Sequence, residues 1–358
     1  MTETLKSNKI QYQVGIGIMS GTSLDGIDIA ACSFKDSYTF DLIDFKGIAY
    51  STEWKAKLEK APTLNGIELR LLEIEYSEFI ADQVKNFLGD TAITPDFIAC
   101  HGHTIFHQPD KKLTCQILDG SVVAAKTKIT TVCDFRSGDV ALGGQGAPLV
   151  PIGDKVLFRK YEACLNLGGI ANLSFEQNGI RKAYDIGPAN LLLNKLAGRE
   201  GLDYDKDGDL ARSGKIIAPL LHKLNSLDYY TMSPPKSLGR EWLEEHVFPL
   251  FTAESTADLL ATSIEHIASQ IATALNETSD LGLILATGGG AHNTFLMEMI
   301  SGKTKSVIEI PSQEIIDAKE AIIFALLGKL RLENKINTLA SVTGASRDSC
   351  GGAVYLGC

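Results

Sequence analysis

The sequence has 358 residues, enough for about two domains at roughly 150 residues each. Hydrophobic residues make up 44% and charged residues 22%, which excludes an intrinsically disordered chain. The formal net charge of −10 disfavours nucleic acid and anionic membrane surfaces as partners, because like charges repel.

The sequence carries no evident signal for membrane insertion or secretion. Its longest apolar run, 321–327, is too short to span a bilayer. Residues 1–7 lack the basic start and apolar core of a signal peptide. The seven cysteines include no C-x-x-C pair, and an odd number argues against a disulfide framework or a zinc site. We therefore expect a cytoplasmic protein with reduced thiols.

In chain order, the first half combines short strands with one long helix. The alternation and spacing of apolar residues predict a helix over 67–88 and strands over 12–19, 27–34, 42–50, 97–101, 114–118 and 130–133. A glycine-rich stretch over 138–151 then interrupts the pattern. We take it as the domain junction and predict domains over 1–135 and 136–358.

The second half repeats this organisation. Strands are predicted over 163–167, 171–175, 181–186 and 281–286, and helices over 189–199, 210–224, 240–251, 257–275 and 293–300. Each half begins with a hairpin that turns on glycine. We therefore predict two related α/β domains that face each other across a cleft.

The first glycine turn has two interpretations. Gly21 to Gly26 has the G-x-x-x-x-G spacing of a P-loop, but Ile27 and Asp28 stand where Lys and Ser/Thr must follow. The turn could still bind phosphate through backbone N–H groups and hydroxyls. A tight Asp-Gly hairpin explains the same residues without a ligand.

A second glycine turn, Gly288 to Gly290, follows a buried strand and precedes a helix. A sharp turn needs one glycine, whereas three allow a flat ligand to lie directly on the backbone. This pattern favours ligand contact.

Acidic residues occur in two notable places. Asp185 ends an apolar strand just before a helix, where α/β proteins place their ligands, although a carboxylate there can also simply stabilise the helix N-terminus. The alternating run over 203–209 resembles a calcium loop but has Gly214 at the twelfth position instead of Glu. A helix-capping loop is the better interpretation of that run.

The remaining candidates surround a histidine-rich segment. His101, His103 and His107 could bind a metal ion, but hydrogen bonding at a strand end explains them better, because no second ligand cluster is evident. Arg136 is the best anion clamp in the chain, or else an exposed loop arginine. Glu320 begins an apolar helix and could equally be an ordinary first-turn acid.

Together these segments resemble the anhydro-N-acetylmuramic acid kinases, within the superfamily of actin, sugar kinases and heat-shock chaperone ATPases. One departure is Leu238, where the family pattern has Thr. The matching segments follow one another over most of the chain: 17–28, 100–109, 134–139, 143–149, 166–172, 185–190, 234–240 and 287–293.

The resemblance implies two actin-like (ribonuclease H-like) domains with ATP and sugar in the cleft between them. It also implies a reaction of cell-wall recycling, in which 1,6-anhydro-N-acetylmuramic acid, ATP and water give N-acetylmuramic acid 6-phosphate and ADP. Because the anhydro bridge leaves no free 6-hydroxyl, phosphorylation must be coupled to ring opening.

The resemblance further implies roles for individual residues. Asp185 aligns with the general base that activates water, and Arg136 is a reasonable partner for the lactyl carboxylate. Magnesium is expected with ATP; the sequence does not identify its ligands, for which Asp25 and Asp28 are candidates. The implied sugar contacts are His101, His103, Arg136, Asn190 and Glu320. The implied ATP contacts are Gly21, Thr22, Ser23, Leu24, Asp25, Gly26, Ile27, Asp28, Asn166, Gly168, Gly169, Gly288, Gly289 and Gly290.

Three other functions compete with this one. A sugar kinase acting on a free hydroxyl would share the fold, and an ATP-switched binding protein would need no Asp185. A metal-dependent hydrolase built on the histidines would need bound metal. Small molecules are the expected partners, without nucleic acid or membrane, and a homodimer is compatible with the sequence.

Overall fold

The computed structural model describes residues 13–21, 24–36, 38–251, 253–278 and 282–357. It divides into two compact units, unit 1 with residues 1–157 and 317–358, and unit 2 with residues 158–316. This division differs from the predicted boundary at residue 135. The glycine-rich stretch lies within unit 1, and the end of the chain returns to unit 1 because strand β13 (Ala353–Tyr355) pairs with strand β7 (Thr130–Cys133).

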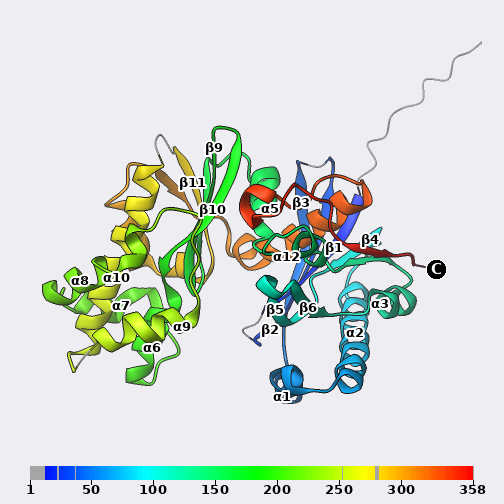
Figure 1. Ribbon diagram of the computed structural model, residues 1–358, viewed down its shortest axis with the longest axis horizontal. Helices are drawn as coiled ribbons and strands as arrows, with labels where there is room; N and C mark the ends of the chain where they lie inside the picture. The colour runs from blue at the N-terminus through cyan, green and yellow to red at the C-terminus, as the bar shows by residue number, and fades with distance from the viewer. Residues whose placement is uncertain (1–12, 22–23, 37, 252, 279–281, 358) are drawn as a thin grey trace, which may run out of the picture. The chain divides into compact units, whose positions relative to one another are not determined.

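Each unit is a mixed α/β structure (Figure 1). Unit 1 contains β1 (Gln13–Ser20), β2 (Gly26–Phe34), β3 (Phe40–Ala49), α1 (Thr52–Lys60), α2 (Gly66–Gly89), β4 (Phe97–Cys100), β5 (His103–Gln108), β6 (Leu113–Ile117), α3 (Gly120–Thr127), β7, α4 (Ser137–Ala141), α5 (Val150–Leu157), most of α12 (Gln313–Leu332), α13 (Ala340–Thr343) and β13. Unit 2 contains β8 (Ala163–Leu167), β9 (Ile170–Gln177), β10 (Ile180–Pro188), α6 (Asn190–Ala197), α7 (Asp209–Ser213), α8 (Ala218–Asn225), α9 (Arg240–Trp242), α10 (Thr256–Glu277), β11 (Leu283–Thr287), α11 (Thr294–Ser301) and β12 (Val307–Glu309).

The main sheets of the two units have the same topology. Unit 1 has the order β13-β7-β4-β1-β2-β3, and unit 2 has the order β10-β9-β8-β11-β12. In both, three consecutive antiparallel strands are followed by two strands parallel to the first. Strand β13 is an addition at the edge of the first sheet. The shared order confirms the predicted repeat and the actin-like, ribonuclease H-like fold class.

The predicted strands are present, with boundaries that differ by at most two residues. The helix predicted over 210–224 is wrong, because α7 ends at Ser213 and α8 begins at Ala218. A Cβ at Gly214 would lie 2.1 Å from the Ala257 carbonyl oxygen, so the chain turns there against helix α10. Among the described residues, no helix is both long and apolar enough to cross a membrane.

Helix α2 begins at a reciprocal cap. The Asn65 side chain accepts from the backbone N–H groups of Ile67 and Glu68, and the Glu68 carboxylate accepts from the Asn65 N–H. Such a capping box satisfies N–H groups that have no partner within the helix. The predicted apolar face is largely confirmed, but Leu71 is 61% exposed.

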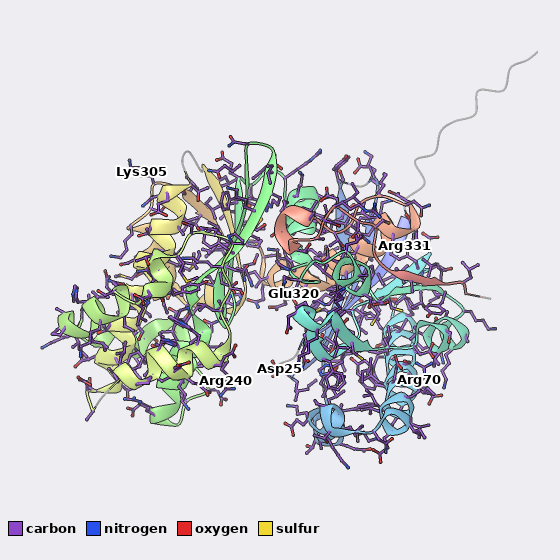
Figure 2. The ribbon with its side chains drawn as sticks, in the orientation of Figure 1. Asp25, Arg70, Arg240, Lys305, Glu320 and Arg331 are labelled. Carbon is purple, nitrogen blue, oxygen red and sulfur yellow. The ribbon has the colours of Figure 1, made fainter. Side chains whose placement is uncertain are left out.

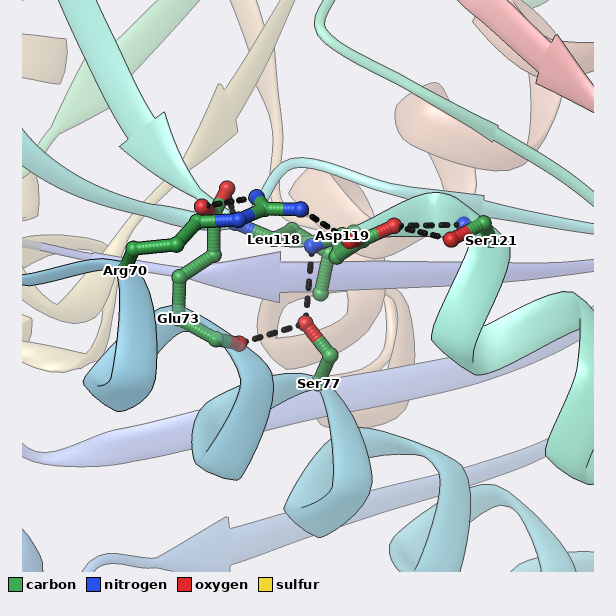
Figure 3. Close-up of polar contacts among 6 residues, drawn as sticks. All are labelled: Arg70, Glu73, Ser77, Leu118, Asp119 and Ser121. Atoms are coloured by element: carbon green, nitrogen blue, oxygen red, sulfur yellow. Dashed lines mark hydrogen bonds and ion pairs between the residues drawn. The ribbon is translucent and has the colours of Figure 1, made fainter. Parts of the chain in front are cut away.

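A polar cluster joins helix α2 to the start of α3 (Figure 3). Asp119 caps α3 by accepting from the Ser121 N–H at 2.9 Å. The Asp119 N–H donates to Ser77 Oγ at 2.7 Å, and Arg70 contacts the carboxylates of both Glu73 and Asp119. These contacts hold the two helices together without placing an unpaired charge in the core.

Helix α12 packs directly on the first sheet at a glycine of β1. A Cβ on Gly17 would lie 1.8 Å from the Ala321 carbonyl oxygen. Gly17→Ala should therefore destabilise unit 1 by about 1–3 kcal/mol or more, because backbone cannot give way as a flexible side chain does. Thermal unfolding checks this, with Gly66→Ala as control, since a Cβ there meets nothing within 4 Å. Equal melting temperatures for the two variants would contradict the packing.

Candidate active site

The end of strand β1 in unit 1 carries a chain of buried hydroxyl groups. Ser20 Oγ lies 2.7 Å from the Tyr50 hydroxyl and 2.9 Å from His103 Nδ1. The Tyr50 hydroxyl lies 2.8 Å from that of Tyr76, which is fully buried. Burial lowers the pKa of His103 to about 4, so this imidazole is neutral near pH 7.

His101 and Arg136 meet beside this chain. His101 Nδ1 donates to the Ser20 carbonyl oxygen at 3.2 Å, and its Nε2 accepts from Arg136 Nε at 3.0 Å. Burial, aided by the Arg136 charge, lowers the pKa of His101 to about 3. Both ring nitrogens of His101 are therefore engaged in hydrogen bonds within unit 1, as the hydrogen-bonding interpretation predicts.

Arg136 is a preorganised cation. Besides its bond to His101, its Nη1 donates to the Gly146 carbonyl oxygen at 2.6 Å. A guanidinium has five N–H donors in a rigid fork, and these two contacts fix its plane and leave further donors for an anion. Burial lowers the pKa of Arg136 to about 10. Because this value is still well above neutral pH, the guanidinium stays charged there.

Carboxylates gather around Asp28 on strand β2. Burial, together with the negative charges of Glu320, Asp317 and Asp25, raises the pKa of Asp28 to about 6. Glu320, on α12, and Asp25, after β1, are exposed to solvent (Figure 2). Repulsion between like charges costs free energy, so this arrangement favours a cation or a bound group that relieves it.

The carboxylates around Asp28 give a stability prediction. The pKa of Asp28 is raised relative to an unfolded chain, so its ionisation weakens the fold as the pH rises from about 4 through about 6. Asp28→Asn should therefore melt at a higher temperature than the wild type at pH 7.5 and at the same temperature at pH 4. Thermal scans across this range check it. A lower melting temperature for Asp28→Asn at pH 7.5 would contradict the repulsion.

Asp185 lies in strand β10 of unit 2 and is half-buried. Its Oδ2 accepts from the Leu238 backbone N–H at 2.9 Å. Burial raises the pKa of the carboxyl, and the Leu238 N–H opposes that rise. Because the contact uses backbone, Leu in place of the family's Thr at this position leaves it intact.

The second glycine turn lies at a pocket of about 430 Å³ within unit 2. Gly288 has φ of +84°, which side chains rarely adopt, and a Cβ on Gly290 would lie 2.8 Å from Leu167 Cβ. Gly289 differs, because a Cβ there meets only Asn190 Nδ2 at 3.6 Å. Of these three glycines, Gly289 is therefore the one that could carry a side chain without a clash, and it lines the pocket. The pocket is lined by Asn190, Leu193, Asn194, Tyr204, Asp205, Lys206, Asp207, Gly289, Gly290, His292 and Asn293.

The second predicted phosphate hairpin is tied to the helix that follows it. The carbonyl oxygens of Gly168 and Gly169 accept from the backbone N–H groups of Asn190 and Ala189 at 3.1 and 2.9 Å. Asn190 also donates from Nδ2 to the Leu167 carbonyl oxygen at 3.0 Å. Asn190, predicted as a sugar contact, thus lines the same pocket as the glycine turn, and Asn166 lies close to Gly288.

The first predicted phosphate hairpin is only partly described. Thr22 and Ser23 lie outside the described residues, whereas Leu24 has φ of +60°. Ile27 is 1% exposed and belongs to the core, so only its backbone is available to a ligand. A Cβ on Gly26 would lie 2.1 Å from the Ile48 carbonyl oxygen, which explains this glycine by strand packing alone.

Sequence reasoning missed several residues of these sites. The Ser20–Tyr50–Tyr76 chain has no local signal, because its members are far apart in the sequence. Asp205, in the acidic run, accepts from the N–H groups of Leu210 and Ala211 at 2.9 Å each, which confirms the predicted capping loop. That the same loop also lines a pocket was not predicted.

The histidine cluster does not form a metal centre. His107 Nδ1 contacts Thr114 Oγ1 at 3.1 Å, away from the hydrogen bonds of His101 and His103. Within the part of the chain that the structure describes, no three His, Cys, Asp or Glu side chains are placed to hold a metal ion. The positions of the three histidines therefore favour the hydrogen-bonding interpretation.

The features described so far are typical of the actin-like class of ATPases and sugar kinases. They are two units whose sheets share a strand order, a glycine turn at a pocket, and a carboxylate fixed near the end of β10. A profile of the family described as anhydro-N-acetylmuramic acid kinase matches residues 13–357. This chain belongs to that family. It is an enzyme, an ATP-dependent kinase of peptidoglycan recycling that acts on small molecules.

Three relatives named anhydro-N-acetylmuramic acid kinase illustrate the match. The protein of Vibrio cholerae serotype O1 is 36% identical and covers 96% of this chain and 99% of its own length. Those of Aliivibrio fischeri and Francisella tularensis subsp. novicida are each 36% identical and cover 95% and 94% of this chain and 98% and 96% of their own. Among solved structures, component A of the Acidaminococcus fermentans (R)-2-hydroxyglutaryl-CoA dehydratase covers 88% of this chain and 96% of its own length. Its sequence identity is 12% and its TM-score is 0.46.

Proposed function

We propose that Asp185 is the general base of a reaction that opens 1,6-anhydro-N-acetylmuramic acid with water and phosphorylates its 6-oxygen. The observation that carries this is the half-buried Asp185 carboxylate, fixed by the Leu238 N–H at 2.9 Å. A base needs a fixed position and an ionised form at the working pH. The backbone contact supplies the position and favours the ionised form.

The bond changes balance as follows. Asp185 accepts a proton from water as the water oxygen bonds to the anomeric carbon, and the bond between that carbon and the 6-oxygen breaks. The 6-oxygen then bonds to the γ-phosphorus of ATP, and ADP leaves. One water is consumed, and the ring opens in the same reaction that forms the phosphate ester.

We assign the pocket of unit 2 to the adenosine part of ATP. Its volume of about 430 Å³ is within the range typical of small-molecule sites. Gly289 and Gly290 form part of its wall, and Asn190 lies beside them, so we move Asn190 from the sugar to the nucleotide. The glycine turns over 21–26 and 168–169 are proposed phosphate contacts.

We assign Arg136 to the lactyl carboxylate of the sugar. Its guanidinium is held by His101 and Gly146, and an arginine fixed in this way suits a carboxylate, which it can bind with two parallel hydrogen bonds. His101, His103 and Glu320 are proposed to complete the sugar contacts from unit 1.

Magnesium fits the carboxylates around Asp28. Mg²⁺ prefers oxygen ligands and commonly uses one or two carboxylates together with phosphate oxygens, so Asp28 and Asp25 would hold it without a larger protein cage. When bound, it would neutralise charge on the phosphates of ATP.

We further propose that the enzyme works in the cytoplasm, where ATP is available. A homodimer stays a prediction, which light scattering checks.

The test of this function is ADP release measured with three sugars. We expect turnover with 1,6-anhydro-N-acetylmuramic acid and formation of N-acetylmuramic acid 6-phosphate, with little turnover of N-acetylmuramic acid or glucose. Equal or greater turnover with a sugar that has a free 6-hydroxyl would favour an ordinary sugar kinase instead.

A further inference from the structure

A single segment of unit 2 encloses Asp185 at the free edge of its sheet. Strand β10 is the outermost strand of this sheet, and among the described residues no further strand pairs with it at that edge. There the Asp185 N–H donates to the Lys236 carbonyl oxygen at 3.1 Å, and the Leu238 N–H donates to Asp185 Oδ2 at 2.9 Å. The segment over 236–238 therefore fixes both the backbone and the carboxylate of Asp185.

Two adjacent tyrosines lie earlier in the same stretch of chain, 229–238, and also contact β10; Lys236 Nζ donates to the Tyr229 carbonyl oxygen at 3.1 Å. The Tyr229 hydroxyl donates to the Asp185 carbonyl oxygen at 2.6 Å. The Tyr230 side chain packs on Gly187, where a Cβ would lie 3.1 Å from the tyrosine hydroxyl. The pairing of β10 with β9 is irregular between Asp185 and Gly187, so the tyrosines contact both sides of a bulge, a feature that re-aims side chains.

The second tyrosine is anchored in the core by a buried histidine. His266, on helix α10, is 1% exposed, and its Nε2 accepts from the Tyr230 hydroxyl at 2.8 Å. His266 Nδ1 donates to Asn225 Oδ1 at 2.6 Å, and that oxygen also accepts from Gln270 Nε2 at 3.0 Å. With one nitrogen donating and the other accepting, the His266 imidazole is neutral. Burial favours this form, because it lowers the pKa of His266 to about 3.

Packing alone does not account for this connected set. A buried polar group gains little net stability over an apolar one of the same shape, whereas a fully satisfied network holds one geometry. The hydrogen bonds and ring contacts lead from α10 through the two tyrosines to the backbone of Asp185. A base on an edge strand needs support on its open side, because an edge strand is otherwise hydrogen-bonded to a neighbouring strand on one side only. These contacts supply that support.

We propose that Tyr229, Tyr230 and His266 are positioning residues that hold the Asp185 carboxylate in its reactive orientation. The proposal rests on the proposed function, in which Asp185 is the base. None of the three needs to touch the substrate. They act through the segment over 229–238 and the bulge in β10.

The test uses Tyr229→Phe and Tyr230→Phe, each of which removes one hydroxyl and keeps the ring. Each should lower kcat by between about 10- and 100-fold, the range expected when a reacting group is displaced by up to about 1 Å. The KM for ATP should stay unchanged, because neither tyrosine lines the pocket assigned to adenosine. The double variant should be little worse than the poorer single one, because both hydroxyls hold the same segment.

Tyr161→Phe is the matched control. It removes a hydroxyl that contacts Glu309 in the same unit, without a contact to Asp185 or to the 229–238 segment. It should leave kcat unchanged even if it lowers the melting temperature. All variants are assayed well below their melting temperatures, so that a purely structural effect lowers the melting temperature and leaves kcat intact.

Asp185→Asn in the same assay separates the two claims. Loss of turnover in Asp185→Asn together with normal kcat in both tyrosine variants would overturn the positioning network and leave the proposed base in place. Normal turnover in Asp185→Asn would overturn the proposed base itself. Loss of kcat in both tyrosine variants and in Asp185→Asn, with a normal Tyr161→Phe, is the result we expect.

Discussion

Asp185→Asn is expected to lower kcat by about 10²–10⁴-fold, the contribution typical of a positioned general base. The amide keeps the shape of the side chain and can still accept from the Leu238 N–H. ATP and sugar should therefore bind with nearly unchanged affinity. Turnover, calorimetric affinities and melting temperature, measured on one preparation, check the three parts of this expectation.

The control for Asp185→Asn is Asp209→Asn. Asp209 is an exposed acid in the first turn of α7, so its loss costs about 0.3–1 kcal/mol of stability through the helix dipole and should not affect turnover. If Asp185 served only its neighbouring helix, the two variants would behave alike. Near-normal turnover in Asp185→Asn would thus reject its role as the base.

Gly289→Val is expected to weaken ATP binding by roughly 100-fold, a loss of about 2.7 kcal/mol of binding free energy. A Cβ on Gly289 meets only Asn190 Nδ2, at 3.6 Å, so the fold accommodates it. The branched side chain then occupies space in the pocket that we assign to adenosine. Calorimetric titration with ATP measures the loss directly.

Two further variants make this result specific. Gly289→Ala should give an intermediate loss, because its side chain is smaller. Gly89→Val, at the end of α2, where a Cβ meets nothing within 4 Å, should leave ATP affinity unchanged. A folded Gly289→Val protein that binds ATP as the wild type does would show that adenosine binds elsewhere.

Much of the fold follows from local patterns in the sequence. The strand at 163–167 ends where expected, and the helix predicted over 67–88 spans Gly66–Gly89, because cap residues and apolar spacing act over a few positions. The hairpin repeat was also predicted, since glycine marks both turns. The family segments also predict Asp185 and the glycine turn over 288–290 as site residues.

The features that were missed depend on contacts between distant residues. Gly214 interrupts a helical pattern because the backbone of Ala257 approaches it closely. Ala257 is more than forty residues away in the sequence, so local patterns around Gly214 do not reveal this contact. The division into units was misplaced because the last forty residues or so rejoin unit 1 through β13 and α12. The tyrosine pair at 229–230 and His266 gave no signal, since an isolated histidine on an apolar helix has no chemistry until its neighbours are known.

The most direct test of the account is turnover in ¹⁸O-labelled water, with the product quenched early and analysed by mass spectrometry. The account predicts one ¹⁸O atom at the anomeric carbon of N-acetylmuramic acid 6-phosphate and none in the phosphate ester, because water activated by Asp185 attacks that carbon and the original 6-oxygen accepts the phosphoryl group. Label in the phosphate ester, or its absence from the anomeric position, would contradict it.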